Sequence, residues 1–312
     1  MPLFRISVVD GEAKLHKSSA PLSPALRQGL ASDGPVMILI HGYKFDPSQT
    51  VKDPHAHIFG YAPKGNFKAV SWPSHLGYGR GDAQEGLCIA FGWPASGWFW
   101  DVYEEAARAS RALADLVRQI RVIAPGRPVH ILAHSLGARV GLGALPLLAP
   151  GDISRAVLLG GCEYTSRAEA ALDQGAGRSV EVLNITSREN DVFELMFERL
   201  VRPGRLRDRG IGMGLRTPRA RWVDIQIDHP ETRRLLFALG LPIADGRHRF
   251  CHWSTYNRRG VMRFYAECLR HPRTLRLETL AERLPPQQPR FSRLLTLPDL
   301  PALLPSGLKR PS

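Results

Sequence analysis

Short β-rich runs, most of them apolar, alternate with longer segments of helical periodicity along this chain of 312 residues. The runs that predict strands are residues 36–40, 67–72, 129–133, 155–160, 180–186 and 222–228. Most of them contain few polar positions, which is typical of parallel strands that are buried on both faces. The alternation predicts an α/β protein, an αβα sandwich with a mostly parallel sheet.

Two segments between these runs have the spacing of amphipathic helices. In the first, apolar residues recur every three or four positions, at Val102, Ala106, Ala109, Leu113, Leu116, Ile120 and Ile123. The second is predicted from Leu136 to about Leu148, where small residues permit close packing on a sheet. We expect Pro146 to bend or end that helix, because proline lacks a backbone N–H.

Two regions interrupt the alternation. Residues 73–100 interleave six glycines with Trp93, Trp98, Phe99 and Trp100, and we interpret them as an excursion over the edge of the sheet. Their aromatic side chains would either line a pocket or cover the core. Residues 285–312 carry seven prolines and predict a tail that wraps the surface or is disordered. The sequence thus predicts one domain over residues 1–284, with an insertion at about 73–100, followed by the tail.

The composition narrows the function classes. The net charge is +13, but the basic residues are scattered and do not alternate with aromatic ones, so we expect a solvated basic surface and no nucleic-acid partner. Four cysteines lie far apart without a CxxC pair, which indicates reduced thiols. No apolar run approaches the ~18 residues that span a bilayer, and the first residues do not resemble a secretion signal. These features predict a cytoplasmic protein without a membrane span and leave its oligomeric state open.

Ser135 is the candidate nucleophile. It stands in the run AHSLG, directly after the apolar run 129–133 and directly before the second helix. A sharp turn between strand and helix exposes a serine hydroxyl, and it requires small neighbours such as Ala133 and Gly137. The alternative is that Ser135 only caps the helix. The AHSLG run resembles that of many lipases and esterases of the α/β-hydrolase family.

That resemblance implies an oxyanion hole. The segment His41-Gly42-Tyr43 follows the first apolar run and resembles the HG segment of α/β-hydrolases. The backbone N–H groups of Tyr43 and Leu136 are then the expected donors to a developing oxyanion. We interpret His41 as a structural histidine, because the family places its catalytic base last in the chain.

The family's chain order of serine, acid and histidine also predicts the other two catalytic residues. Asp191 follows the run 180–186 and is the expected acid, although it could instead cap a helix, and Glu189 is a weaker rival. His252 is the expected base, since the aromatic loop and helix after it resemble the ending of uncharacterised bacterial α/β-hydrolases. His229 competes with it but could simply begin a helix, and His248 is a remote third.

The sequence therefore predicts a serine hydrolase that cleaves a small-molecule carboxylic ester, or a related acyl bond, through an acyl-enzyme. The resemblance implies no cofactor. Asp53, His55 and His57 suggest metal ligands, but no second cluster completes a site, so no catalytic metal is expected. Two alternatives stay open: an acyltransferase with the same triad, and a non-catalytic binding or scaffold protein on a hydrolase fold.

Overall fold

The centre of the molecule is an eight-stranded sheet. The computed structural model describes residues 3–62, 70–82, 84–203, 207–246 and 248–295. The strand order is β2-β1-β4-β3-β5-β6-β7-β8, and all neighbours are parallel except the antiparallel pair β1 and β2. The strands are β1 (Leu3–Val9), β2 (Glu12–Leu15), β3 (Val36–Ile40), β4 (Leu87–Gly92), β5 (Val129–His134), β6 (Arg155–Leu159), β7 (Glu181–Thr186) and β8 (Trp222–Gln226).

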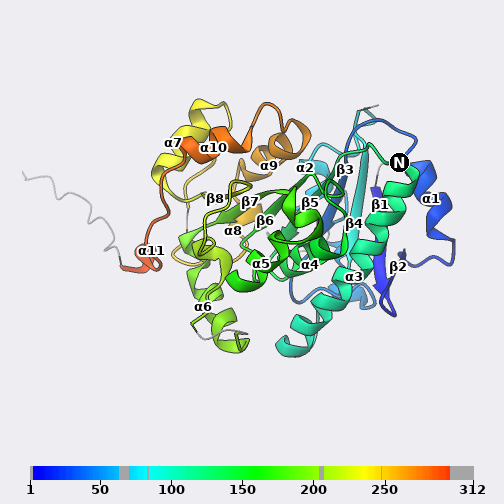
Figure 1. The fold of residues 1–312 in the computed structure, drawn as a ribbon, viewed down its shortest axis with the longest axis horizontal. Helices are drawn as coiled ribbons and strands as arrows, with labels where there is room; N and C mark the ends of the chain where they lie inside the picture. Colours follow the sequence, from blue (N-terminus) through cyan, green and yellow to red (C-terminus); the bar gives the residue numbers. More distant parts are fainter. Residues whose placement is uncertain (1–2, 63–69, 83, 204–206, 247, 296–312) are drawn as a thin grey trace, which may run out of the picture.

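Helices cover both faces of this sheet (Figure 1). One apolar core lies under α1 (Leu22–Gly29), α3 (Phe99–Ile123), α4 (Gly137–Ala144) and α5 (Thr165–Leu172). The other lies under α2 (Trp72–His75), α7 (Pro230–Ala238), α9 (Val261–Arg270) and α10 (Leu277–Arg283). The side chains of successive strand residues pack into opposite cores, as those of Ile38 and Leu39 do, because side chains alternate between the two faces of a strand. The predicted αβα sandwich is confirmed.

Three further helices lie beyond the carboxyl ends of the strands or near the end of the described chain. They are α6 (Asp191–Leu200), α8 (Ser254–Asn257) and α11 (Ser292–Leu295). In the part of the chain that the structure describes, no helix combines the length and apolar character that a bilayer crossing requires.

Five of the six predicted strands are present, but the prediction for residues 67–72 is not fulfilled. Residues 67–69 lie outside the described residues. Ser71 precedes α2, and its hydroxyl accepts a hydrogen bond from the Ser74 N–H at 3.3 Å. A serine that caps a helix in this way competes with extended structure. The segment therefore enters a helix where the apolar pattern predicts a strand.

The interpretation of residues 73–100 as an excursion is also corrected. Within them, β4 is fully buried and pairs in parallel with both β1 and β3. Gly86 directs the chain into β4: its φ is +71°, and a Cβ there would lie 2.1 Å from the Pro35 carbonyl oxygen. The many glycines thus surround a central strand, and they made it resemble a loop in the sequence.

The two predicted helices are present with shifted ends. α3 begins at Phe99, three residues before the first residue of the predicted stripe. α4 ends at Ala144, and Pro146 lies in the single 3₁₀ turn that follows it, Leu145–Leu147. Of the Pro-rich tail, residues 285–295 run along the body of the molecule, while 296–312 lie outside the described residues.

Candidate active site

Ser135 lies in a strained turn at the carboxyl end of β5. Its φ is +54°, in the left-handed region that non-glycine residues rarely adopt. The turn is fixed because the Ser135 N–H donates to the Leu159 carbonyl at 3.0 Å. Strain of this kind persists only where the surrounding structure enforces it, and it clusters at functional sites. The geometry is that of a strand-turn-helix nucleophile elbow.

The turn needs small residues around it. A Cβ at Gly137 would lie 2.6 Å from the His41 carbonyl oxygen and 2.7 Å from that of Ile40. A Cβ at Gly42 would lie 2.6 Å from the Ser135 Cβ. Gly42 therefore brings the loop after β3 into direct contact with the serine.

This loop is tied down on its far side. The Lys44 N–H donates to the Ala95 carbonyl at 2.7 Å, and the Tyr43 hydroxyl donates to the Gly97 carbonyl at 2.7 Å. Among the described residues, neither the Tyr43 N–H nor the Leu136 N–H has a hydrogen-bond acceptor. Both predicted oxyanion donors are thus free to bind another oxygen.

His41 holds the same loop from within the core. Its Nδ1 donates to the Gly42 carbonyl at 2.9 Å, and its Nε2 accepts from the Trp93 N–H at 3.0 Å. The Trp93 indole in turn donates to the His41 carbonyl at 2.9 Å. Burial lowers the pKa of His41 to about 4, so the ring stays neutral, as this pattern requires. These bonds agree with a structural histidine.

His252 lies in the segment between α7 and α8 and is oriented by Asn190. Its Nδ1 lies 2.7 Å from Asn190 Oδ1. An amide oxygen is only an acceptor, so Nδ1 carries the proton and Nε2 keeps its lone pair. A neutral imidazole in this tautomer has the form that a general base needs.

The expected orienting residue, Asp191, is engaged elsewhere, and this corrects the prediction. One of its oxygens, Oδ2, accepts from the Phe291 N–H at 2.6 Å, and Oδ1 lies 3.4 Å from the buried guanidinium of Arg188. Asp191 begins α6, whereas Asn190 ends the preceding 3₁₀ turn. Asn190 and Asp191 are adjacent in the chain, but only the Asn190 side chain is directed toward His252. Glu189 points away as well, with Oε2 2.8 Å from Arg258.

The competing histidines lie in other surroundings. His229 caps α7, because its ring accepts from the Glu231 N–H at 3.1 Å. The His248 carbonyl accepts from Arg293 at 3.2 Å. Of the three, His252 alone lines the pocket that contains Ser135.

The surroundings of His252 favour its neutral form. Burial and the neighbouring His134 ring, whose centroid is 4.7 Å away, hold the pKa of His252 well below its usual value. Burial lowers the pKa of His134 to about 4. Because Asn190 is uncharged, it does not offset these effects as a carboxylate would.

Ser135 and His252 open into a pocket of about 520 Å³ at the carboxyl ends of the strands. Its walls are mainly apolar and aromatic: Tyr43, Phe45, Phe99, Phe193, Met196, Phe197, Leu200, Trp253 and Tyr256. Lys44 and His57 also line it. In this structure Ser135 Oγ lies 3.5 Å from Cys162 Sγ, and within the described residues it has no hydrogen bond to His252.

Several pocket residues were not predicted from the sequence. Asn190 is one, and the α6 residues Phe193, Met196, Phe197 and Leu200 are others. The α6 residues are spaced at i, i+3, i+4 and i+7, so their apolar stripe was a usable signal. Of the four aromatic residues considered in 73–100, Phe99 lines the pocket, Trp93 is buried, and Trp98 and Trp100 are exposed.

A separate group of side chains has metal-like composition. Potential ligand atoms of His16, Asp53 and His55 lie within 4.8 Å of one another, while His57 lines the active-site pocket instead. In the structure this group forms a hydrogen-bonded chain. Ser7 Oγ lies 2.9 Å from His16 Nδ1 and 3.1 Å from His55 Nε2, and His16 Nε2 lies 3.2 Å from Asp53.

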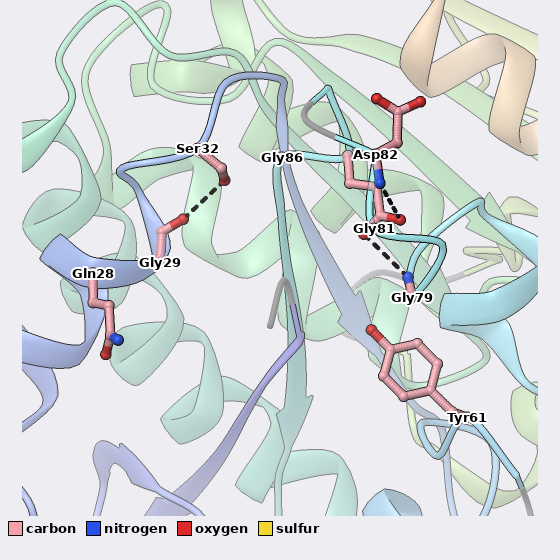
Figure 2. Close-up of a pocket in the computed structure, with 9 residues that line it drawn as sticks. Gln28, Gly29, Ser32, Tyr61, Gly79, Gly81, Asp82 and Gly86 are labelled. Atoms are coloured by element: carbon pink, nitrogen blue, oxygen red, sulfur yellow. Dashed lines mark hydrogen bonds between the residues drawn. The ribbon is translucent and has the colours of Figure 1, made fainter.

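A cavity of about 650 Å³ also lies away from the elbow, beside Tyr61 and the glycine-rich loop before β4 (Figure 2). Its Glu85 carboxylate accepts backbone N–H bonds from Gly79 at 3.1 Å and Asp82 at 3.3 Å. This carboxylate therefore organises the loop, and the cavity contains none of the predicted catalytic residues. The pocket at Ser135 is smaller, but it contains both the candidate nucleophile Ser135 and the candidate base His252.

Comparisons with known proteins agree with the fold. The sequence model of a family described as "Alpha/beta hydrolase of unknown function (DUF900)" matches residues 22–157. No curated protein matches the chain.

Two solved structures illustrate how distant the similar folds are. A Trichoderma reesei cutinase in complex with a phosphonate inhibitor is 13% identical, with 45% of this chain and 64% of that chain covered and a TM-score of 0.23. A lipase-esterase related protein from Clostridium acetobutylicum is 9% identical, with coverages of 50% and 78% and a TM-score of 0.26. The match thus spans less than two thirds of the cutinase, and likeness at this level does not bear on substrate. The chain is thus an αβα sandwich with a mostly parallel sheet, and over residues 22–157 it is similar to a family of α/β-hydrolases.

Proposed function

We propose that the chain is a serine hydrolase that cleaves carboxylic esters with Ser135, His252 and Asn190. The observation that carries the proposal is the shared pocket: a serine in a left-handed turn and a histidine with a fixed tautomer both line it. The triad differs from the predicted Ser135, Asp191 and His252 only in the orienting residue.

The reaction begins when Ser135 rotates from Cys162 toward His252. Hydrogen bonds of this kind are often long or absent before substrate binds. His252 Nε2 then takes the hydroxyl proton while Oγ attacks the acyl carbonyl. The N–H groups of Tyr43 and Leu136 bind the oxyanion, and each such donor is worth roughly 10² to 10³ in rate.

Collapse of the tetrahedral intermediate releases the alcohol, which takes its proton from His252. Water then attacks the acyl-enzyme, with the same histidine as its base, and the released acid restores Ser135. Asn190 keeps the imidazole in the required tautomer throughout, but it contributes no charge to the imidazolium.

The pocket supports an ester with an apolar acyl group. Aromatic and aliphatic side chains from the β3 loop, the start of α3 and one face of α6 line its walls. Lys44 brings the sole formal charge among the pocket-lining residues described. All four cysteines are free, which supports a reducing compartment such as the cytoplasm.

A fluorophosphonate probe tests the nucleophile, since it forms a covalent adduct with an activated serine. We expect labelling of the wild-type protein at Ser135 and none in Ser135→Ala. Nitrophenyl esters of increasing acyl length then measure turnover and chain preference. A folded wild-type protein that neither labels nor hydrolyses any of them would contradict the proposal and favour the non-catalytic alternative.

A further inference from the structure

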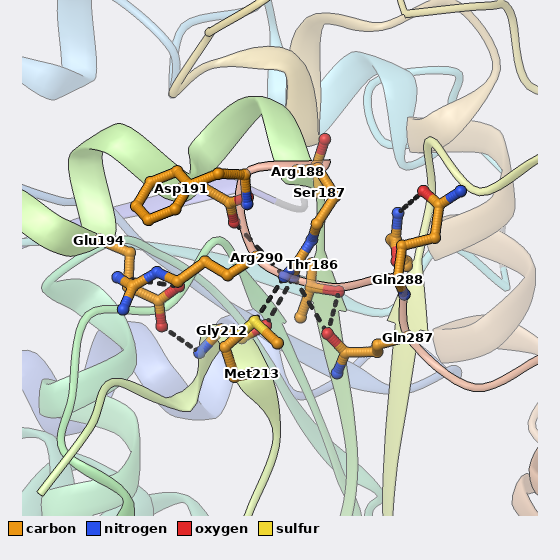
Figure 3. Close-up of polar contacts among 12 residues, drawn as sticks. Thr186, Ser187, Arg188, Asp191, Glu194, Gly212, Met213, Gln287, Gln288 and Arg290 are labelled. Carbon is orange, nitrogen blue, oxygen red and sulfur yellow. Dashed lines mark hydrogen bonds and ion pairs between the residues drawn. The ribbon is translucent and has the colours of Figure 1, made fainter. Parts of the chain in front are cut away.

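Residues 285–295, which we call the C-terminal strap, cross the carboxyl ends of β7 and β8 beside the segment that carries Asn190 (Figure 3). The strap is joined to both strands by side-chain amides. Gln287 Oε1 lies 3.4 Å from Thr186 Oγ1, and Gln288 exchanges two hydrogen bonds of 2.8 Å with the Gln226 side chain. This segment is therefore part of the fold, although its prolines predict a tail.

The strap also binds the loop Ser187–Asp191, which we call the Asn190 loop. Gln287 Oε1 accepts from the buried guanidinium of Arg188 at 3.0 Å. The Phe291 N–H donates to Asp191 at 2.6 Å. Arg290 of the strap pairs with two glutamates of α6: its guanidinium lies 2.8 Å from Glu198 and 3.8 Å from Glu194. The residues on either side of Asn190 are thus held partly by the strap.

Arg293 of the strap reaches further, to the segment before His252. Its guanidinium lies 3.5 Å from Glu189 Oε1 and 3.7 Å from Asp228 Oδ2. It also donates to the carbonyls of Gly246 at 3.0 Å and His248 at 3.2 Å. One side chain therefore connects the Asn190 loop with the segment that leads to His252.

The Asn190 loop and the chain around His252 also contact each other directly, close to His252 and Asn190. The Cys251 N–H donates to the Glu189 carbonyl at 2.8 Å, and Arg258 pairs with the Glu189 carboxylate at 2.8 Å. The bond between His252 and Asn190 depends on the same register. Glu189 is 1% exposed and lies between Arg258 and Arg293, so loss of Arg293 would leave one of its oxygens less well compensated.

We propose that Arg293 is a positioning residue that holds the His252–Asn190 pair in register through Glu189 and the carbonyls of Gly246 and His248. This inference rests on the proposed function only for its kinetic consequence. The structural part, that Arg293 controls the environment of His252, stands without any turnover.

The test compares Arg293→Ala with Arg293→Lys and with Arg276→Ala. Arg276 is a matched control, because it pairs with Glu278 at 3.6 Å on the exposed surface. We expect Arg293→Ala to lower kcat by about tenfold or more with little change in KM, since small misplacements of catalytic groups are costly. Arg293→Lys should restore part of the loss, and Arg276→Ala should match the wild type.

A second readout follows the His252 ring by NMR across pH. In Arg293→Ala a looser pocket admits water, so the apparent pKa of His252 should rise toward its ordinary value. Unchanged kcat together with an unchanged His252 titration would overturn the proposal. If Arg293→Ala does not fold, Arg293→Lys decides by the same two measurements. If the wild-type protein lacks esterase activity, the proposed function fails, and the titration alone still decides the role of Arg293.

Discussion

Asn190 gives His252 an orientation without giving it a counter-charge. The amide oxygen fixes the Nδ1 proton, yet burial and His134 still disfavour the imidazolium. An aspartate at this position would add an opposite charge within hydrogen-bond distance, which raises the pKa of the histidine because it favours the protonated form. Orientation and charge, which one carboxylate usually supplies together, are separated here.

Substitution of Asn190 therefore has distinguishable outcomes. In Asn190→Asp we expect the acid limb of kcat/KM to move to higher pH, because the carboxylate stabilises protonated His252. In Asn190→Ala the tautomer is no longer fixed, and kcat should fall by about 10² or more. Asp191→Ala serves as the comparison: if it lowers kcat as much as Asn190→Ala without loss of stability, the assignment of Asn190 is wrong.

The contact between Gly42 and Ser135 predicts a second residue-level effect. A methyl group at Gly42 would lie 2.6 Å from Ser135 Cβ and 2.9 Å from the His134 carbonyl oxygen, so the loop or the elbow must move. We expect Gly42→Ala to reduce kcat by about 10² or more, since an oxyanion donor is displaced. Gly126→Ala is the control, because nothing lies within 4 Å of that Cβ. Equal activity of the two variants would argue against the oxyanion role of this loop.

At this scale the sequence predicted Ser135, Tyr43, Leu136 and His252 as candidates, since each follows an apolar run or a family-like motif, and the structure brings Ser135, Tyr43 and His252 to one pocket. The sequence was insufficient for the orienting residue. Asn190 and Asp191 are adjacent, and which of them faces His252 depends on the 3₁₀ turn before α6 and on the strap that occupies Asp191. The strap is a tertiary feature without a local signal. The 3₁₀ turn has a local cap in Ser187, but the cap does not tell which of the two neighbouring side chains faces His252.

Among the elements, α6 forms one wall of the pocket. Met196 is 51% exposed and Leu200 is 39% exposed, although both are large and apolar. Exposed apolar side chains beside a pocket can contact the distal part of an acyl chain. We therefore expect α6 to contact the acyl chain of the proposed ester substrate.

Replacement of Met196 by serine tests this expectation. We expect Met196→Ser to lower kcat/KM for long-chain esters by about tenfold, as one lost apolar contact is worth roughly 1 to 3 kcal/mol, and to leave acetyl esters nearly unchanged. Phe237→Ser is the control, because Phe237 is also exposed but lies on α7. A uniform effect on all chain lengths would show that α6 does not contact the acyl group.

Whether a strand could be predicted depended on the residues that flank it in the sequence. β3, β5, β6, β7 and β8 coincide with predicted runs, although β7 and β8 also contain polar residues such as Asn184 and Asp224, and their prediction is confirmed. β4 has a similar run, Leu87–Phe91, but the glycines around it indicated a loop. β1 and β2 were not predicted, because β1 includes the polar residues Arg5 and Ser7 and β2 is only four residues long.

For the whole molecule, neutral buried histidines couple stability to pH. Burial lowers the pKa of His41 and His134 to about 4, of His130 to about 3 and of His55 to about 2. The folded state thus binds fewer protons than the unfolded state, whose histidines titrate near 6.5. Their full contribution is present above pH 6.5 and is lost as the pH falls below it.

The expected size is large enough to measure. At pH 5 each of these histidines costs about 2 kcal/mol. Glu194 acts in the opposite direction, because burial raises its pKa to about 7, and it returns about 2 kcal/mol over the same range. Urea unfolding between pH 7.5 and 5 should therefore show a marked fall in midpoint. His130→Gln should show a smaller fall, and a constant wild-type midpoint would contradict the account.

The neutral partner of His252 has a consequence for the pH range in which the proposed hydrolase would work. Because burial and His134 hold the pKa of His252 well below its usual value, acid would weaken the fold through the other buried histidines before it protonates the proposed base. Decline in acid would then follow the loss of the folded state. The acid limit of the enzyme would report the durability of its fold, while the chemistry of its base stays hidden beneath that limit.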